Sequence, residues 1–120
     1  MNILSELNTV ISALNIPVET GIFSGVPPDE YAVLTPLADS FVLFGDNKPQ
    51  AEICDVRVSL FTKGNYLKTA RLITSSLLST GFVITDRRYI GHESDTGYNN
   101  YAIDCSQFYG VKQEYGLEEM

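Results

Sequence analysis

The sequence predicts an α+β domain: a mostly antiparallel sheet of four to five strands, with an N-terminal helix and a second helix packed on one face of the sheet. Apolar residues recur every three or four positions in residues 3–14 and again in 66–78, which is the spacing of amphipathic helices. Residues 54–60 instead alternate apolar and polar side chains, as a strand with one buried face does. Further runs rich in β-branched and aromatic residues supply the remaining strands.

The N-terminal helix is expected because six apolar side chains in residues 3–14 form one stripe: Ile3, Leu4, Leu7, Val10, Ile11 and Leu14. Asn2 precedes the stripe and is a preferred N-cap residue, while Pro17 lies just beyond it and stops the helix. Residues 20–30 are dense in Gly and Pro and are expected to form a loop. Three apolar residues of this loop either pack against the core or meet a partner: Ile22, Phe23 and Val26.

Two strand-like runs follow the loop, at residues 31–37 and 40–46. Little separates them, so we expect a hairpin or a bent pair of strands. Pro36 has no backbone N–H, which places the first run at a sheet edge or its end inside a bulge. Residues 45–50 have the composition of an exposed turn or loop.

The strand over residues 54–60 leads directly into the second helix. One of its faces is apolar and the other carries Asp55, Arg57 and Ser59. The chain turns at residues 63–65, where Asn65 is suited to cap the helix that follows. Gly81 supplies the left-handed position that ends this helix.

Two more strands, residues 82–93 and 98–110, are expected to form a hairpin around the turn residues 94–97. The whole chain, residues 1–120, is predicted to be one domain, because 120 residues suit a single core and no internal repeat or second domain is visible. Residues 110–120 end acidic and without pattern, so we expect a flexible tail.

Composition excludes several classes of function. The net charge is −7, and clustered basic groups of the kind that bind nucleic acid are missing, so no specific nucleic-acid binding is expected. No apolar run approaches the roughly 20 residues of a membrane span. The first residues lack the pattern of a secretory signal, which predicts synthesis in a cytoplasm.

The sequence offers little that indicates chemistry. Cys54 and Cys105 lie in apolar strand patterns and are interpreted as buried hydrophobic residues rather than a disulfide or redox pair. His92 lies beside Glu93 and Asp95, where a polar turn explains it better than a general base or a metal site. We therefore expect no enzyme activity and no catalytic, cofactor-binding or metal-binding residues. The alternative left open is an enzyme or ligand-binding domain with a cleft near His92 and Arg87.

The tyrosine and arginine residues outside the expected core favour protein–protein contact. Tyr residues gather in and near the last hairpin, and a ring with a polar tip suits interfaces. The pair Arg87 and Arg88 is interpreted as a solvated strand or a protein contact. The candidate assembly surface comprises six residues: Asp55, Arg57, Ser59, Arg87, Arg88 and Tyr98.

Residues 27–52, 56–82 and 85–105 resemble the tail terminator family of long-tailed phages and prophages of Gram-positive bacteria, also called tail completion or tail-to-head joining proteins. The resemblance extends from about Val18 to Tyr109. Its most specific parts are Y-A-V-L after a Pro-rich loop, V-x-V-x-L-F leading into N-Y, and D-T-G-Y before the last strand.

The resemblance implies an α+β subunit that assembles with itself into a ring, commonly a hexamer, at the head–tail junction of the virion. Its implied partners are the major tail tube protein and the head connector or stopper protein, and DNA passes through the ring. No cofactor is implied. The acidic charge would suit a lumen through which DNA slides without adsorbing. Another minor tail or connector protein, or a small adaptor domain from outside phages that binds one partner as a monomer, remains the alternative.

Overall fold

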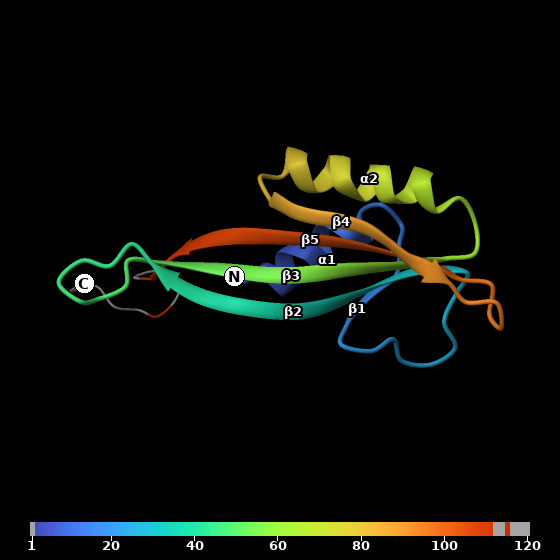
Figure 1. The fold of residues 1–120 in the computed structure, drawn as a ribbon, viewed down its shortest axis with the longest axis horizontal. Helices are drawn as coiled ribbons and strands as arrows, with labels where there is room; N and C mark the ends of the chain where they lie inside the picture. Colours follow the sequence, from blue (N-terminus) through green and yellow to red (C-terminus); the bar gives the residue numbers. More distant parts are fainter. Residues whose placement is uncertain (1, 112–114, 116–120) are drawn as a thin grey trace.

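The computed structural model describes residues 2–111 and residue 115. It is one α+β domain with two helices and a five-stranded, mostly antiparallel sheet, which confirms the predicted fold class (Figure 1). The elements follow in the order α1 (Ile3–Ser12), β1 (Val18–Thr20), β2 (Glu30–Val42), β3 (Ala51–Thr62), α2 (Tyr66–Ser79), β4 (Val83–His92) and β5 (Asn99–Gly110).

The strands lie in the order β1-β2-β3-β5-β4, so the last strand in the sequence is inserted between β3 and β4. β1 is parallel to β2, and every other neighbouring pair is antiparallel. The sequence pattern does not indicate β1, since its three residues are fixed as a strand only by pairing with residues 32–34.

The runs 31–37 and 40–46 were expected to form a hairpin or a bent pair of strands, and the structure has neither. β2 is one strand that continues through Ala38, Asp39 and Ser40, which pair with residues 53–55 of β3. The register shifts between Pro36 and Ala38, as expected for a proline within a strand run. Pairing along β3 therefore overrides the turn propensity of this segment.

The helix ends use the residues that the sequence indicates. The side chain of Asn2 accepts a hydrogen bond from the backbone N–H of Ser5, and the Ser5 hydroxyl completes a capping box. Asn65 caps α2 with its side chain, which accepts from the N–H of Lys68 at 3.2 Å. Gly81 follows α2 with φ of +92°, a conformation in which a side chain would be strained.

Both helices pack on one face of the sheet. Cys54, Val56, Val58 and Leu60 of β3 are buried there, in one core cluster with residues of α1, α2, β2 and β5. The intervening residues of β3 are only partly buried, because neither described helix covers the opposite face (Figure 1). This alternation along β3 agrees with the period-two pattern of the sequence.

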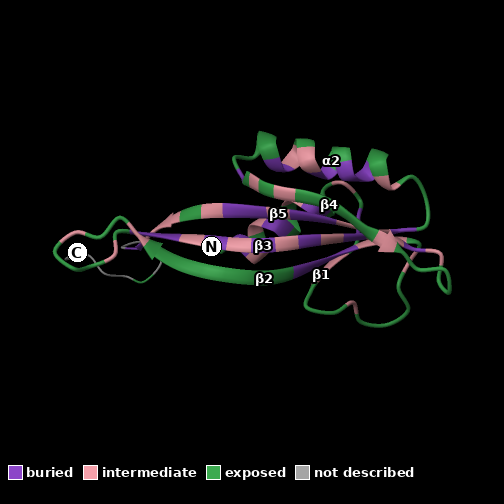
Figure 2. Cartoon of the chain, in the orientation of Figure 1, coloured by how far each residue is buried: buried purple, intermediate pink, exposed green. Residues whose placement is uncertain are grey.

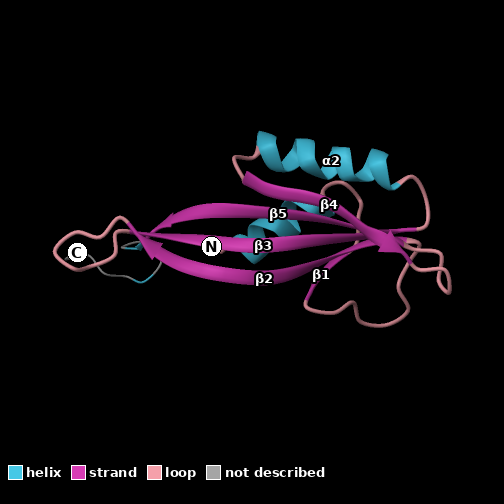
Figure 3. Ribbon diagram, in the orientation of Figure 1, coloured by secondary structure: helices cyan, strands magenta, loops and turns pink. Residues whose placement is uncertain are grey.

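The helices cover only part of the sheet's length. At 1.5 Å per residue the 14 residues of α2 span about 21 Å, whereas the 12 residues of β3 span about 40 Å. The β2–β3 hairpin therefore extends beyond both helices, and the outer half of β2 is exposed (Figure 2, Figure 3). We call residues 35–55, this end of the hairpin with its loop, the arm.

The segment 110–120, predicted as a flexible tail, is described only in part. Gly110 ends β5, Val111 is buried, and the Tyr115 ring lies 5.9 Å from that of Phe41. The Tyr115 hydroxyl donates a hydrogen bond of 2.8 Å to Glu52. The prediction for residues 112–114 and 116–120 lies outside the described part of the chain.

Candidate assembly surfaces

The open face of the sheet carries most of the predicted surface residues. Asp55, Arg57 and Ser59 point there from β3, and Arg88 points there from β4, where it stands opposite Ala102 of β5. The structure therefore brings four of the six predicted residues onto one face.

The charges on this face are paired within the chain. Arg57 donates two hydrogen bonds to Asp104 of the neighbouring strand, at 2.7 and 3.0 Å, and this contact raises the pKa of the guanidinium further. The Ser106 hydroxyl donates to Asp55, and Arg88 forms an ion pair with Asp86 at 2.7 Å. The first two contacts join β3 to β5 and the third lies within β4; together they leave few unpaired charges on the open face for a neighbour.

Arg87 lies on the other side of β4. It stands opposite the core residue Ile103, so its side chain emerges on the helix side, at the edge of the sheet. Together with Arg71 of α2 it lines a hollow that includes Tyr101. Neither arginine has an ion pair or a side-chain hydrogen bond with any described residue. His92 does not line this hollow; its Nδ1 lies 3.2 Å from Oδ1 of Asn99.

Tyr98 is buried rather than displayed. Its side chain is 5% exposed, and its hydroxyl donates to the backbone carbonyl of Pro28 at 2.6 Å. Its ring meets those of Tyr31 and Phe61 edge-on, and Lys63 lies over it. The expectation that Tyr98 contacts a partner is therefore replaced by a structural role, in which it holds the loop of residues 21–29 against the open face.

The apolar residues of that loop were expected either to pack against the domain or to stay exposed for a partner, and the loop contains residues of both kinds. The Phe23 ring contacts that of Tyr31, with centroids 4.7 Å apart, and so packs against the domain. Ile22 and Val26 are exposed.

The arm is the surface feature that the sequence did not predict. Its apolar residues Leu37, Phe41, Leu43 and Phe44 are between 47% and 64% exposed, which is too much for core residues. The tip is a tight turn in which Asp46 and Asn47 both have positive φ. The sequence signal was weak, because the length of β2 depends on the pairing of residues 38–40 with residues 53–55.

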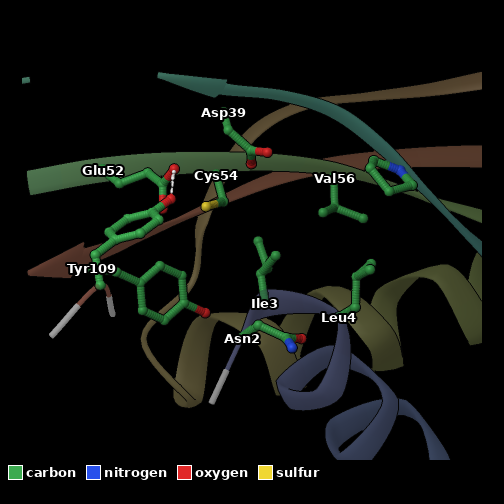
Figure 4. Close-up of a pocket in the computed structure, with 10 residues that line it drawn as sticks. Asn2, Ile3, Leu4, Asp39, Glu52, Cys54, Val56 and Tyr109 are labelled. Carbon is green, nitrogen blue, oxygen red and sulfur yellow. Dashed lines mark hydrogen bonds between the residues drawn. The ribbon is translucent and has the colours of Figure 1, made fainter. Parts of the chain in front are cut away.

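A hollow of about 340 Å³ lies at the base of the arm, where α1 meets β2 and β3. Ile3 and Leu4 of α1 and Val56 of β3 form its apolar part, and Asp39 of β2 faces it (Figure 4). Glu52 also lines it, but its carboxylate already accepts from Tyr115. Asp39 is exposed, so the hollow combines apolar walls with an accessible carboxylate.

The cysteines occupy the helix side of the sheet, buried and free, in agreement with their interpretation as hydrophobic residues. Burial raises the pKa of the Cys105 thiol to about 12. Among the described residues, no group of three or more His, Cys, Asp and Glu side chains could hold a metal ion. Neither described helix is long and apolar enough to cross a membrane.

No family model matches the chain, and no curated protein matches it.

Proposed function

We propose that this chain is a structural subunit that assembles with copies of itself into a ring. We further propose that the ring acts at the head–tail junction of a long-tailed phage, where it caps the tail tube and joins it to the head connector. The observation that carries self-assembly is the arm, whose outer end projects beyond both helices and which leaves four large apolar residues exposed: Leu37, Phe41, Leu43 and Phe44 (Figure 2).

Exposed apolar surface of this kind marks interaction sites on soluble proteins. Leu43 and Phe44 follow the end of β2 and are 63% and 64% exposed, so most of their surface adds little to the stability of the single subunit. Covering them with a second copy would gain about 25 cal/mol for each Å² of apolar surface removed from water. The exposed apolar surface therefore supports self-assembly as the function of the subunit.

The place at the head–tail junction rests on the resemblance of residues 27–52, 56–82 and 85–105 to tail terminators. The N-terminal helix, the long strand followed by a helix, and the closing hairpin that the resemblance implies are all present as α1, β3–α2 and β4–β5. The continuous strand β2 departs from the implied early hairpin.

The first test is the oligomeric state of the purified chain over a range of concentrations, measured by analytical ultracentrifugation. The wild type is expected to form a ring-sized species as concentration rises. The variant Leu43→Asn/Phe44→Ser should stay monomeric; Asn is chosen because Leu43 has φ of 56°, which Asn tolerates. The matched control, Ile22→Ser/Val26→Ser, removes exposed apolar residues from the loop before β2 instead and should assemble normally.

The second test is electron microscopy of phage particles made without this protein. Headless tails of excessive length are expected if the chain terminates the tail. Headless tails of normal length would overturn the terminator role in favour of a neighbouring connector role, and normal particles would overturn both.

A further inference from the structure

We propose that the arm of one copy binds the outer edge formed by α2 and β4 of a second copy, head to tail. This inference rests on the self-assembly proposed above and names the two surfaces that meet. We call residues 66–92, which comprise α2, β4 and the turn between them, the basic edge.

The two surfaces carry opposite charge. The arm, residues 35–55, contains four carboxylates and one lysine, a formal charge of −3. The basic edge contains four of the chain's eight Lys and Arg residues and one aspartate, a formal charge of +3. In a chain with a net charge of −7 this segregation is pronounced, and it favours the approach of arm to edge over that of arm to arm.

The charges of the basic edge are available for a partner. Lys68, Arg71 and Arg87 have no side-chain ion pair or hydrogen bond with any described residue, whereas Arg88 is held by Asp86. Arg71 and Arg87 lie together across the hollow between α2 and β4. Two cationic side chains that line one hollow without a counter-charge among the described residues suit an acidic partner.

The arm offers a matching receptor at its base. The hollow faced by Asp39 has apolar walls from Ile3, Leu4 and Val56 (Figure 4). An arginine side chain has an apolar stem and a charged, planar end that binds carboxylates at two points. The stem would lie against the walls while the guanidinium reaches Asp39.

Exposed apolar residues accompany the charges on both surfaces. The arm displays Phe41, Leu43 and Phe44, and the basic edge displays Leu67, Leu72, Leu78, Val83 and Ile90. Burial of apolar side chains supplies most of the free energy of such contacts, while the charges fix partner and orientation.

The contact joins different copies. The arm extends along the long axis of a molecule 54 Å in length, away from α2, so a chain cannot fold its own arm onto its own basic edge (Figure 1). Because the two surfaces differ, each copy uses its arm on one neighbour and its edge on the other. Such a heterologous contact repeats around an axis and closes into a ring when the rotation allows.

Charge reversal tests the proposal. Asp39→Lys on the arm and Arg87→Glu on the basic edge should each weaken assembly about tenfold or more, measured by analytical ultracentrifugation at low salt. A chain carrying both substitutions should recover assembly, because the reversed charge on the arm of one copy then meets the reversed charge on the edge of the next. Asp95→Lys, the same charge change in the exposed β4–β5 turn, is the matched control and should assemble like the wild type.

The outcomes of these experiments distinguish the docking of arm to basic edge from self-assembly in general. If Arg87→Glu assembles like the wild type, or the double variant stays as weak as the single variants, the docking of arm to basic edge is overturned while self-assembly stands. A wild type that stays monomeric at every concentration overturns self-assembly itself. Circular dichroism checks that the variants fold; should Asp39→Lys fail, Asp39→Asn replaces it, and its loss should not add to that of Arg87→Gln in the double variant.

Discussion

Arg57 and Asp104 form a two-point ion pair across β3 and β5, with Nε–Oδ1 at 2.7 Å and Nη2–Oδ2 at 3.0 Å. The pair lies on the open face of the sheet, and the Asp104 side chain is the more buried of the two, at 14% exposure. It joins the strands at the centre of the sheet, so its contribution is to the stability of the subunit.

Removing this pair should destabilise the domain measurably. Arg57→Ala leaves the mostly buried Asp104 carboxylate without its partner, and we expect a loss of about 1–2 kcal/mol in the free energy of unfolding, measured in urea. Arg88→Ala is the control. Its ion pair with Asp86 is more exposed, so the loss there should stay below about 0.5 kcal/mol. Equal losses in the two variants would contradict the structural role of the Arg57–Asp104 pair.

Tyr98→Phe should loosen the loop of residues 21–29 without disturbing the sheet. The variant loses the hydrogen bond to the Pro28 carbonyl but keeps the ring contacts, so the expected cost is about 1 kcal/mol. Amide hydrogen exchange should accelerate in residues 21–29 and remain unchanged in β3. Tyr66→Phe is the control, because the Tyr66 hydroxyl makes no hydrogen bond with a described residue. Unaltered exchange in the loop would show that Tyr98 does not hold it.

Stability should fall at alkaline pH, in part through Cys105. Burial raises the pKa of this thiol from 9.0 to about 12, so the folded chain holds the proton more tightly than the unfolded chain. The contribution is complete below about pH 9 and is lost as pH rises from about 9 toward 12. Urea unfolding between about pH 7 and pH 10.5 should show this decline, and it should be smaller in Cys105→Ala. An identical pH dependence in both proteins would contradict it.

Features set by neighbouring residues could be predicted from the sequence. The caps Asn2 and Asn65 and the helix end at Gly81 depend on local hydrogen bonds and on φ, and all three are confirmed. The alternation along β3 and the burial of Cys54 and Cys105 follow from strand periodicity, which is also local.

Features that depend on pairing between distant parts of the chain could not be predicted from the sequence. The segment 38–40 resembles a turn until it is paired with residues 53–55, and β1 is a strand only because residues 32–34 lie beside it. Tyr98 follows a turn sequence, yet the loop at Pro28 buries it. Within the candidate surface, period two placed Asp55, Arg57 and Ser59 on one face, whereas the side taken by Arg87 depends on the register of β4 with β5.

The insertion of β5 between β3 and β4 determines when the sheet can be completed during synthesis. Within the described sheet β4 has no strand neighbour other than β5, so it cannot join the sheet until residues 99–110 have left the ribosome. The pairing of β5 with β3, which are separated in the chain by α2 and β4, also forms slowly. A nascent chain therefore presents its arm before the basic edge has reached its final position in the sheet. Under the head-to-tail contact proposed above, a growing chain would lack half of that contact, so ring formation would wait for finished subunits.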